Sequence, residues 1–367
     1  MRDLGDAFRA VMADTGWSAS RLARELGSSQ PWVSMVLAGK RDPGVRRAAA
    51  LLKSAGWELA LVPSGDNDPV RRRDFLLTAA TVALVPTANT TANPYTSPAY
   101  VDAVATRLAQ HEAQLGGAPL AREAVRHASR VIPVARSGGP ALAAAASRLC
   151  RQSALILHDV RKLDQAETTA RAALALGLSA GDTAASASAL ACDVLSMTTA
   201  HLPDGRGAMY ARRGLALGGL DDASAAMLSA RLGRSLALAG RSGPARASFD
   251  QALGLDGSAE VTGNCGIGLT DLGLCGLAED HLTTAARLTA DSPFLHALYL
   301  ARLAKSALRA RDPELTAGRM ATLAALAPLV DSPRLTIDLK HLYDGTRIWE
   351  PIPEVRDARD GLREAMA

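Results

Sequence analysis

The chain has 367 residues, of which 48% are hydrophobic but only 4% aromatic, so much of its apolar content is Ala and Leu, which argues against a large β-sheet. No apolar run reaches the roughly 18 residues of a membrane span. The four cysteines form no CxxC pair and have no histidine at metal-ligand spacing, which indicates buried thiols in a reducing compartment and no metal site. The formal charge of +4 lies at the front, since residues 1–73 hold 12 basic and 8 acidic groups and the remainder is balanced.

The first predicted elements are two short helices joined by a tight turn. Ser18 can cap a helix that runs to Leu26, and Ser29 can cap a second helix that Gly39 closes. This is the helix-turn-helix arrangement, and the basic excess between Ser18 and Lys53 suggests a phosphate backbone as its partner. The buried stripes of the two helices are predicted at Leu22, Ala23, Leu26, Val33, Val36 and Leu37.

The same stretch resembles the Cro/repressor, or XRE, family of transcriptional regulators. The residues in matching register are Leu22-Ala23, Gly27, Ser29-Gln30, Val33-Ser34 and Gly39-Lys40. The resemblance covers roughly residues 3–62, including a leading helix around 8–12 and a following helix around 45–55. It implies binding to double-stranded DNA. The family often has Gln as the second residue of its first motif helix, where this chain has Ala19.

The outward face of the second helix offers few hydrogen bonds to DNA bases. Gln30 and Ser34 are the polar exceptions, and Gln pairs naturally with adenine. Trp32 stands on the flank, where it either contacts DNA or packs beside the motif. The predicted DNA-binding residues are Ser18, Arg21, Ser29, Gln30, Trp32, Ser34, Lys40 and Arg41, with Arg46 and Arg47 as further phosphate contacts. The alternative is a helix-turn-helix used only for protein contacts.

A linker with a short helix is predicted over residues 64–98, after a short strand at 57–62. Within it, "RRRDFLLTAATVALVP" at 71–86 resembles a twin-arginine export signal. Because it follows a complete DNA-binding module, we interpret it as an amphipathic linker helix and expect the protein in the cytoplasm. Residues 86–98 are rich in Thr, Asn and Pro and predict a flexible linker.

From residue 99 the pattern changes to pairs of helices with short turns. Small residues and Leu recur in stretches that begin at Ala166, Gly207, Ala245 and Ala278, at offsets of 41, 38 and 33 residues. Such a period is the signature of an α-solenoid. Residues 153–176 resemble a tetratricopeptide (TPR) repeat. The predicted helix pairs are 99–135, 140–176, 182–217, 221–255, 258–289 and 294–328, with 333–365 as a cap.

The predicted fold is therefore all-α, with a helix-turn-helix domain at 1–63 and a TPR-like α-solenoid at 99–367. A solenoid offers a concave surface to a peptide or protein effector. The candidate effector-binding residues on it are Arg148, Arg151, Gln152 and Asn264; the alternative for each is a solvated surface residue. No nucleophile-base pair, Gly-rich phosphate loop or carboxylate dyad is found, so neither enzymatic activity nor a cofactor is expected.

An XRE-like module followed by TPR-like repeats resembles the RRNPP class of bacterial regulators. That resemblance implies a signalling peptide as the effector of the repeats, by analogy of architecture. The sequence thus predicts a cytoplasmic transcriptional regulator that forms a homodimer through its repeats. The alternative is an adaptor whose repeats recruit another protein, with weak or vestigial DNA binding.

Overall fold

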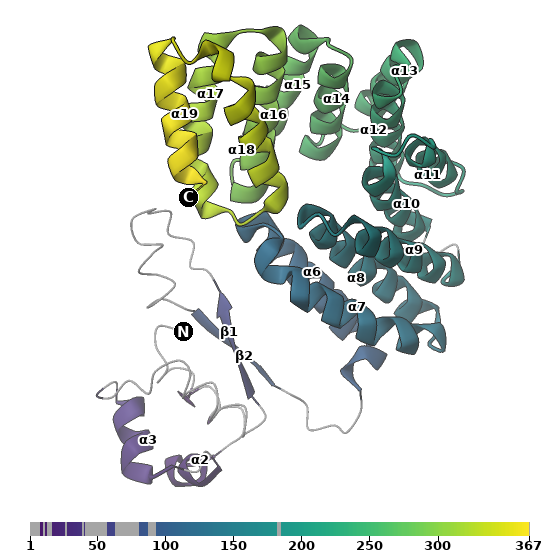
Figure 1. Ribbon diagram of the computed structural model, residues 1–367. Coiled ribbons are helices and arrows are strands. Elements are labelled where there is room, and N and C mark those ends of the chain that lie inside the picture. Colours follow the sequence, from purple (N-terminus) through teal and green to yellow (C-terminus); the bar gives the residue numbers. More distant parts are fainter. Residues whose placement is uncertain are drawn as a thin grey trace. The chain divides into compact units, whose positions relative to one another are not determined.

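The computed structural model describes residues 8, 9, 12, 17–25, 28–38, 40, 57–62, 81–86, 93–181 and 185–366. The chain divides into two compact units, residues 1–93 and 94–367. Each unit is described by itself (Figure 1).

The first unit contains the two helices expected near the front of the chain, α2 at Ala19–Glu25 and α3 at Gln30–Leu37. Both predicted caps are confirmed. The Ser18 hydroxyl accepts a hydrogen bond from the backbone N–H of Arg21 at 3.2 Å, and the Ser29 hydroxyl accepts one from that of Trp32 at 3.4 Å. The buried residues of this small core are Phe8, Leu22, Ala23, Trp32, Val33 and Val36.

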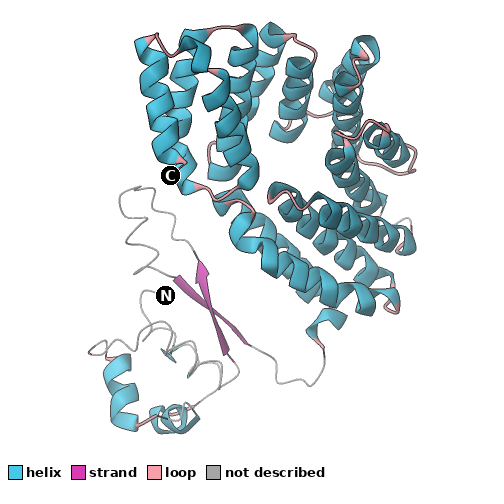
Figure 2. Cartoon of the chain, viewed as in Figure 1, coloured by secondary structure: helices cyan, strands magenta, loops and turns pink. Residues whose placement is uncertain are grey.

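Two short strands follow, β1 at Trp57–Val62 and β2 at Thr81–Pro86, and Figure 2 shows them in magenta. They pair antiparallel, with Trp57 opposite Pro86 and Val62 opposite Thr81. The strand expected at 57–62 is confirmed. The helix interpretation of 71–86 is wrong for residues 81–86, because this β-branched stretch finds a strand to pair with. The arginines of the export-like motif lie outside the described residues.

The second unit is an array of helix pairs, and the predicted pairs are confirmed to within a few residues at every end. Its helices are α6 (Pro98–Leu115), α7 (Ala121–Arg136), α8 (Pro140–Asp159), α9 (Leu163–Ser179), α10 (Ala185–Thr199), α11 (Arg206–Leu215), α12 (Asp222–Leu238), α13 (Ser242–Leu255), α14 (Ala259–Asp271), α15 (Cys275–Leu288), α16 (Pro293–Ala310), α17 (Pro313–Leu326), α18 (Pro333–Gly345) and α19 (Pro353–Ala365). Short 3-10 turns lie at Pro94–Thr96, Ala118–Leu120, Ala327–Leu329 and Arg347–Trp349.

Small residues sit where the helices of the array approach one another most closely. All four residues that mark the sequence period, Ala166, Gly207, Ala245 and Ala278, are buried. Phe249 of α13 fills the space left by two glycines of neighbouring helices. A Cβ atom added to Gly233 of α12 would lie 2.4 Å from the Phe249 ring, and one added to Gly268 of α14 would lie 2.2 Å from it. The small residues that recur along the sequence therefore mark the positions where neighbouring helices touch.

The array begins earlier than the sequence suggested. Tyr95 is buried, and its hydroxyl lies 2.7 Å from Nδ1 of His127 on α7. His127 Nε2 in turn lies 3.1 Å from the carboxylate of Glu123. The linker interpretation of residues 86–98 is therefore wrong for 94–98, because an aromatic anchor holds that segment on the first helix pair.

The first helices of the pairs form a closed cycle of contacts. Each of α6, α8, α10, α12, α14 and α16 packs against the next, and α16 packs against α6 (Figure 1). We call the closing contact the seam; it joins residues 113–118 to 291–292 and 331–332. Nothing in the local periodicity predicts this closure.

Backbone hydrogen bonds hold the seam. The backbone N–H of Asp331 donates to the carbonyl of Leu115 at 2.8 Å, and the N–H of Ala118 donates to the carbonyl of Asp331 at 3.1 Å. Gly116 lies between them with φ +84°, and a Cβ atom there would be 2.6 Å from the Asp331 carbonyl oxygen. This turn therefore needs glycine.

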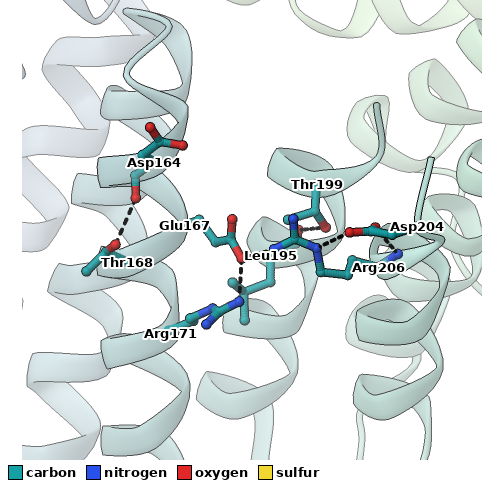
Figure 3. A network of polar contacts seen from close by, with 8 residues as sticks. All are labelled: Asp164, Glu167, Thr168, Arg171, Leu195, Thr199, Asp204 and Arg206. Carbon is teal, nitrogen blue, oxygen red and sulfur yellow. Dashed lines mark hydrogen bonds and ion pairs between the residues drawn. The ribbon is translucent and has the colours of Figure 1, made fainter. Parts of the chain in front are cut away.

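Second helices of neighbouring pairs are joined by ion pairs on the outer side of the array. Glu167 of α9 pairs with Arg171 at 2.6 Å and with Arg206 of α11 at 2.8 Å, and Arg206 also pairs with Asp204 at 2.6 Å (Figure 3). These groups are partly exposed, so each pair contributes little to stability. They fix the spacing of adjacent pairs and do not form a site.

Candidate functional site

The outward face of α3 is the first candidate site. Gln30, Pro31, Ser34, Met35 and Ala38 are all exposed on it, as their spacing predicted. Gln30 and Ser34 lie one turn apart and carry exposed side chains that can form hydrogen bonds. The other three offer apolar contacts, which suit thymine methyl groups. This face can therefore form hydrogen bonds with base edges through few of its side chains.

Trp32 does not belong to that face. Only 7% of its surface is exposed, and its ring centroid lies 6.2 Å from that of Phe8. Its position on the flank of α3 turns it into the small core, where a large aromatic ring gains most from burial. The packing alternative therefore holds for Trp32, and we remove it from the set of candidate DNA contacts.

Basic and hydroxyl groups border the outward face. Arg21 and Lys40 are exposed, and the Arg21 guanidinium lies 5.3 Å above the Trp17 ring, which limits its motion. Ser18 and Ser29 are exposed as well, and their hydroxyl oxygens are engaged as helix caps. Arg41, Arg46 and Arg47 lie outside the described residues.

The second candidate site is the inner face of the repeat array. Of the four residues expected to receive an effector, Arg148 instead forms a two-pronged ion pair with Asp102, both contacts at 2.8 Å, on the exposed surface between α8 and α6. Arg151 is half-buried, and within the described part of the chain its Nε atom has no hydrogen-bond partner. Among the described residues, no contact joins Arg148, Arg151 and Asn264 to one another.

Gln152 and Asn264 are buried and bonded within the protein. Gln152 donates from Nε2 to the Glu112 carboxylate at 2.5 Å. Asn264 accepts at Oδ1 from Nη1 of Arg231 at 2.7 Å and from Nη1 of Arg234 at 3.0 Å. The alternative that these two amides are solvated surface residues is therefore wrong, because charged neighbours from adjacent helices bond to them, and their part in effector binding stays a prediction.

Together these contacts form part of a row of buried or half-buried polar side chains that we call the inner ladder. It takes one residue from each first helix: Glu112, Gln152, Asp193, Arg231, Asn264, Arg302 and Asp338. Arg231 Nε contacts Asp193 Oδ1 at 2.6 Å, and Arg302 contacts Asp338 Oδ2 at 3.0 Å. Most neighbouring members of the inner ladder thus neutralise or hydrogen-bond one another: Glu112 with Gln152, Asp193 with Arg231, Arg231 with Asn264, and Arg302 with Asp338.

Most of the ladder was missed at the sequence level, although a signal for it exists. Arg231 lies 38 residues after Asp193, and Asn264 lies 33 residues after Arg231. These are the offsets at which the small residues recur. Applying the period to Gln152 would have identified Asp193 and Arg231 as equivalent positions.

Cations and carboxylates alternate around the inner ladder. The buried or half-buried cations are Arg151, Arg231, Arg234, Arg302, Lys305 and Arg334, and the carboxylates are Glu112, Asp159, Asp193, Asp271 and Asp338. Burial raises the pKa of Glu112 to about 7, although the charge of Arg334 acts in the opposite direction. Glu112 is therefore partly protonated near neutrality and balances only part of the positive charge near it.

This raised pKa predicts a pH dependence of stability. Because the pKa of Glu112 is higher in the folded chain than its ordinary value of 4.5, folding takes up a proton between these values. The contribution is fully present below pH 4.5 and is lost as the pH rises through about 7. We expect the free energy of unfolding of the wild type to fall, relative to that of Glu112→Gln, between roughly pH 5 and 8. Urea denaturation at several pH values measures it.

The control for that experiment is Glu354→Gln, which changes an exposed carboxylate on α19. Its pH profile should follow the wild type. A Glu112→Gln profile parallel to that of the wild type would contradict the assignment of a raised pKa to Glu112.

The described residues suggest no metal or membrane site. No group of three His, Cys, Asp or Glu side chains there is arranged to hold a metal ion, and no helix there is both long and apolar enough to cross a membrane. Cys150, Cys192 and Cys265 are buried, and burial raises the pKa of the Cys150 and Cys265 thiols to about 12. These thiols are therefore poor nucleophiles at neutral pH.

The chain was also compared with known proteins. No protein-family model matches it, and no curated protein is similar to it at a significant level.

Proposed function

We propose that the protein is a non-enzymatic transcriptional regulator that binds double-stranded DNA through α2 and α3. The observation that carries the proposal is the outward face of α3, where Gln30 and Ser34 stand exposed on a helix whose other side is buried. A short capped helix of this kind fits the major groove, and Arg21 and Lys40 beside it suit phosphates.

The second unit supplies the regulatory part of the proposal. A TPR-like array provides apolar helix surface for a homodimer contact, and its polar interior suits an effector. Two copies of α3 on a palindrome would add their contact energies, which a face with few hydrogen bonds needs. Their half-sites would lie about one helical turn apart. This arrangement is that of the RRNPP class, with the cytoplasm as its compartment.

The DNA-binding proposal is tested by two substitutions with different expected signatures. Gln30→Ala should reduce preference for the cognate site by about 1–3 kcal/mol, since one bidentate base contact is lost. Lys40→Ala should weaken specific and nonspecific binding alike and make the salt slope shallower by about one unit, because it removes a phosphate contact. Equilibrium titration of cognate and scrambled duplexes at several salt concentrations measures both.

Gln251→Ala is the control, because it removes an exposed glutamine of α13 in the other unit. It should leave both affinities unchanged. If Gln30→Ala retains the full preference for the cognate site, direct readout by α3 is wrong.

The second candidate function is an adaptor that recruits another protein through its repeats. The mostly apolar outward face of α3 favours it, since Met35 is 37% exposed and Pro31 and Ala38 lie beside it. Salt-dependent retention of the full chain on duplex DNA separates the two functions. An adaptor would elute at low salt without sequence preference.

A further inference from the structure

The inner side of the repeat array contains three half-buried arginines whose guanidinium groups are only partly paired within the protein. We call Arg234, Arg302 and Arg334 the arginine cluster; they come from α12, α16 and α18. Arg234 shares the Asn264 amide oxygen with Arg231, and its buried Nε atom has no hydrogen-bond partner among the residues that the structure describes. A buried guanidinium donor without an acceptor is costly.

The other two members are only partly compensated. Arg302 shares the Asp338 carboxylate with Lys305, at 3.0 Å and 2.8 Å. Arg334 lies 3.4 Å from Asp159, too far for a good hydrogen bond, and that carboxylate already accepts from the Ser332 hydroxyl and the Gly117 backbone. The carboxylates of Asp338 and Asp159 are thus each divided among several donors.

The positive charges of these arginines change the pKa values of neighbouring groups on several helices. Burial, followed by repulsion from Arg231, lowers the pKa of Arg234 to about 10, and Asp271 offsets this only in part. Burial and then Arg334 lower the pKa of His158 on α8 well below its usual value. The charges of arginines on α12 and α18 therefore act on one another and on His158 of α8.

The fold limits what can reach this interior. The closed cycle from α6 to α16 surrounds it with helices, so a folded partner or a helix cannot lie along it. A low-dielectric surrounding strengthens an ion pair formed there, and the forked geometry of arginine matches planar or tetrahedral oxyanions. A ligand that fits these guanidinium donors is therefore compact and negatively charged.

We propose that the arginine cluster binds a compact oxyanion, a carboxylate or phosphate group, as the effector of the array. The inference rests on the proposed regulatory role of the second unit and names the chemical class of its ligand. Arg234 contacts the anion through its Nε donor, Asn264 positions Arg234, and Arg334, whose Nε has only the long contact with Asp159, contacts the anion from α18. The bound anion supplies a further acceptor and counter-charge to these guanidinium groups.

The experiment uses the full chain without DNA, so that its outcome is independent of α3. Isothermal titration and thermal unfolding are measured with inorganic pyrophosphate, with citrate, and with chloride at equal ionic strength. We expect saturable binding and stabilisation by pyrophosphate or citrate and none by chloride. Whichever of the two binds identifies the source of the oxyanion as phosphate or carboxylate.

Two variants test the assignment to the cluster. Arg234→Gln should bind the anion about tenfold more weakly and, without anion, should unfold at the same temperature as the wild type or higher, because an uncompensated charge is gone. Arg212→Gln, an exposed arginine of α11, should behave as the wild type. The proposal is overturned if neither oxyanion exceeds chloride, if Arg234→Gln binds as the wild type does, or if anion-free Arg234→Gln is strongly destabilised. None of these results bears on sequence preference for DNA, which Gln30→Ala tests.

Discussion

Asp193→Ala is expected to destabilise the repeat array by about 3–5 kcal/mol, because it leaves the guanidinium of Arg231 buried without its carboxylate. Asp193 is 2% exposed and Arg231 9%, and their contact at 2.6 Å joins α10 to α12. The Asn264 amide still accepts from Arg231, but it cannot neutralise a charge. Urea denaturation followed by circular dichroism at 222 nm measures the loss.

The double variant Asp193→Ala/Arg231→Met distinguishes the loss of the ion pair from the cost of leaving the Arg231 guanidinium buried without a carboxylate. It should recover most of the stability, since an apolar side chain of similar length replaces the guanidinium. Asp102→Ala is the matched control, because Asp102 and its partner Arg148 form an exposed pair whose side chains are 40% and 45% accessible. It should cost less than about 1 kcal/mol. Equal losses in Asp193→Ala and Asp102→Ala would contradict this account of the inner ladder.

Phe249→Ala is expected to cost a similar amount, about 3–5 kcal/mol, through the cavity it leaves. The Phe249 ring is 2% exposed and occupies the space between α12 and α14 that Gly233 and Gly268 leave open. Helices without side chains at these two positions cannot collapse far onto the void. Chemical denaturation of the variant measures the cost, and Leu277→Ala, at a residue 52% exposed, is the control with an expected change below about 0.5 kcal/mol.

A coupled substitution tests the same packing from the other side. Gly268→Ala alone should destabilise the array, because its new methyl group would meet the Phe249 ring. In the Phe249→Ala background the same change should be neutral or stabilising, since the ring is gone and alanine favours the helix. Additive effects of the two substitutions would show that the ring does not occupy this space.

The helix pairs could be predicted from the sequence because their contacts are local. Small residues recur where the two helices of a pair, or adjacent pairs, must touch, and this spacing marks the four pairs from α8 to α15. The cap residues Ser18 and Ser29 were predictable for the same reason, since a cap involves only its own helix.

The parts that were missed depend on residues far apart in the chain. Residues 81–86 form a strand because residues 57–62 pair with them, and their own sequence is compatible with a helix as well. Trp32 lies at a position between the outward and inward faces of α3, where only the presence of Phe8 decides that the ring turns inward. Tertiary contacts therefore decide both the strand at residues 81–86 and the orientation of Trp32.

The contacts of the candidate effector residues could not be predicted from the sequence for the same reason. Gln152 and Asn264 were correctly located on the first helices, but whether an amide is free depends on what the next helix presents to it. Glu112 and Arg231 occupy these amides, and both come from other helix pairs. The arginine cluster is assembled by the curvature of the array, which no single repeat encodes.

The seam has a consequence for how the array folds and unfolds. An open row of repeats frays from its ends, because a terminal pair contacts only one neighbour. Here the bonds of the seam join residues far apart in the chain, such as Ser292 and Ala113, which are 179 positions apart, and Asp331 and Leu115, which are farther apart still, so the first pair cannot detach without releasing α16 and the start of α18. Contacts at such separation form after the local helix pairs, since the entropy of closing a long loop opposes them. The two ends of the chain's repeats therefore protect each other, and the amides of Ala118 and Asp331 exchange with solvent only when the seam opens.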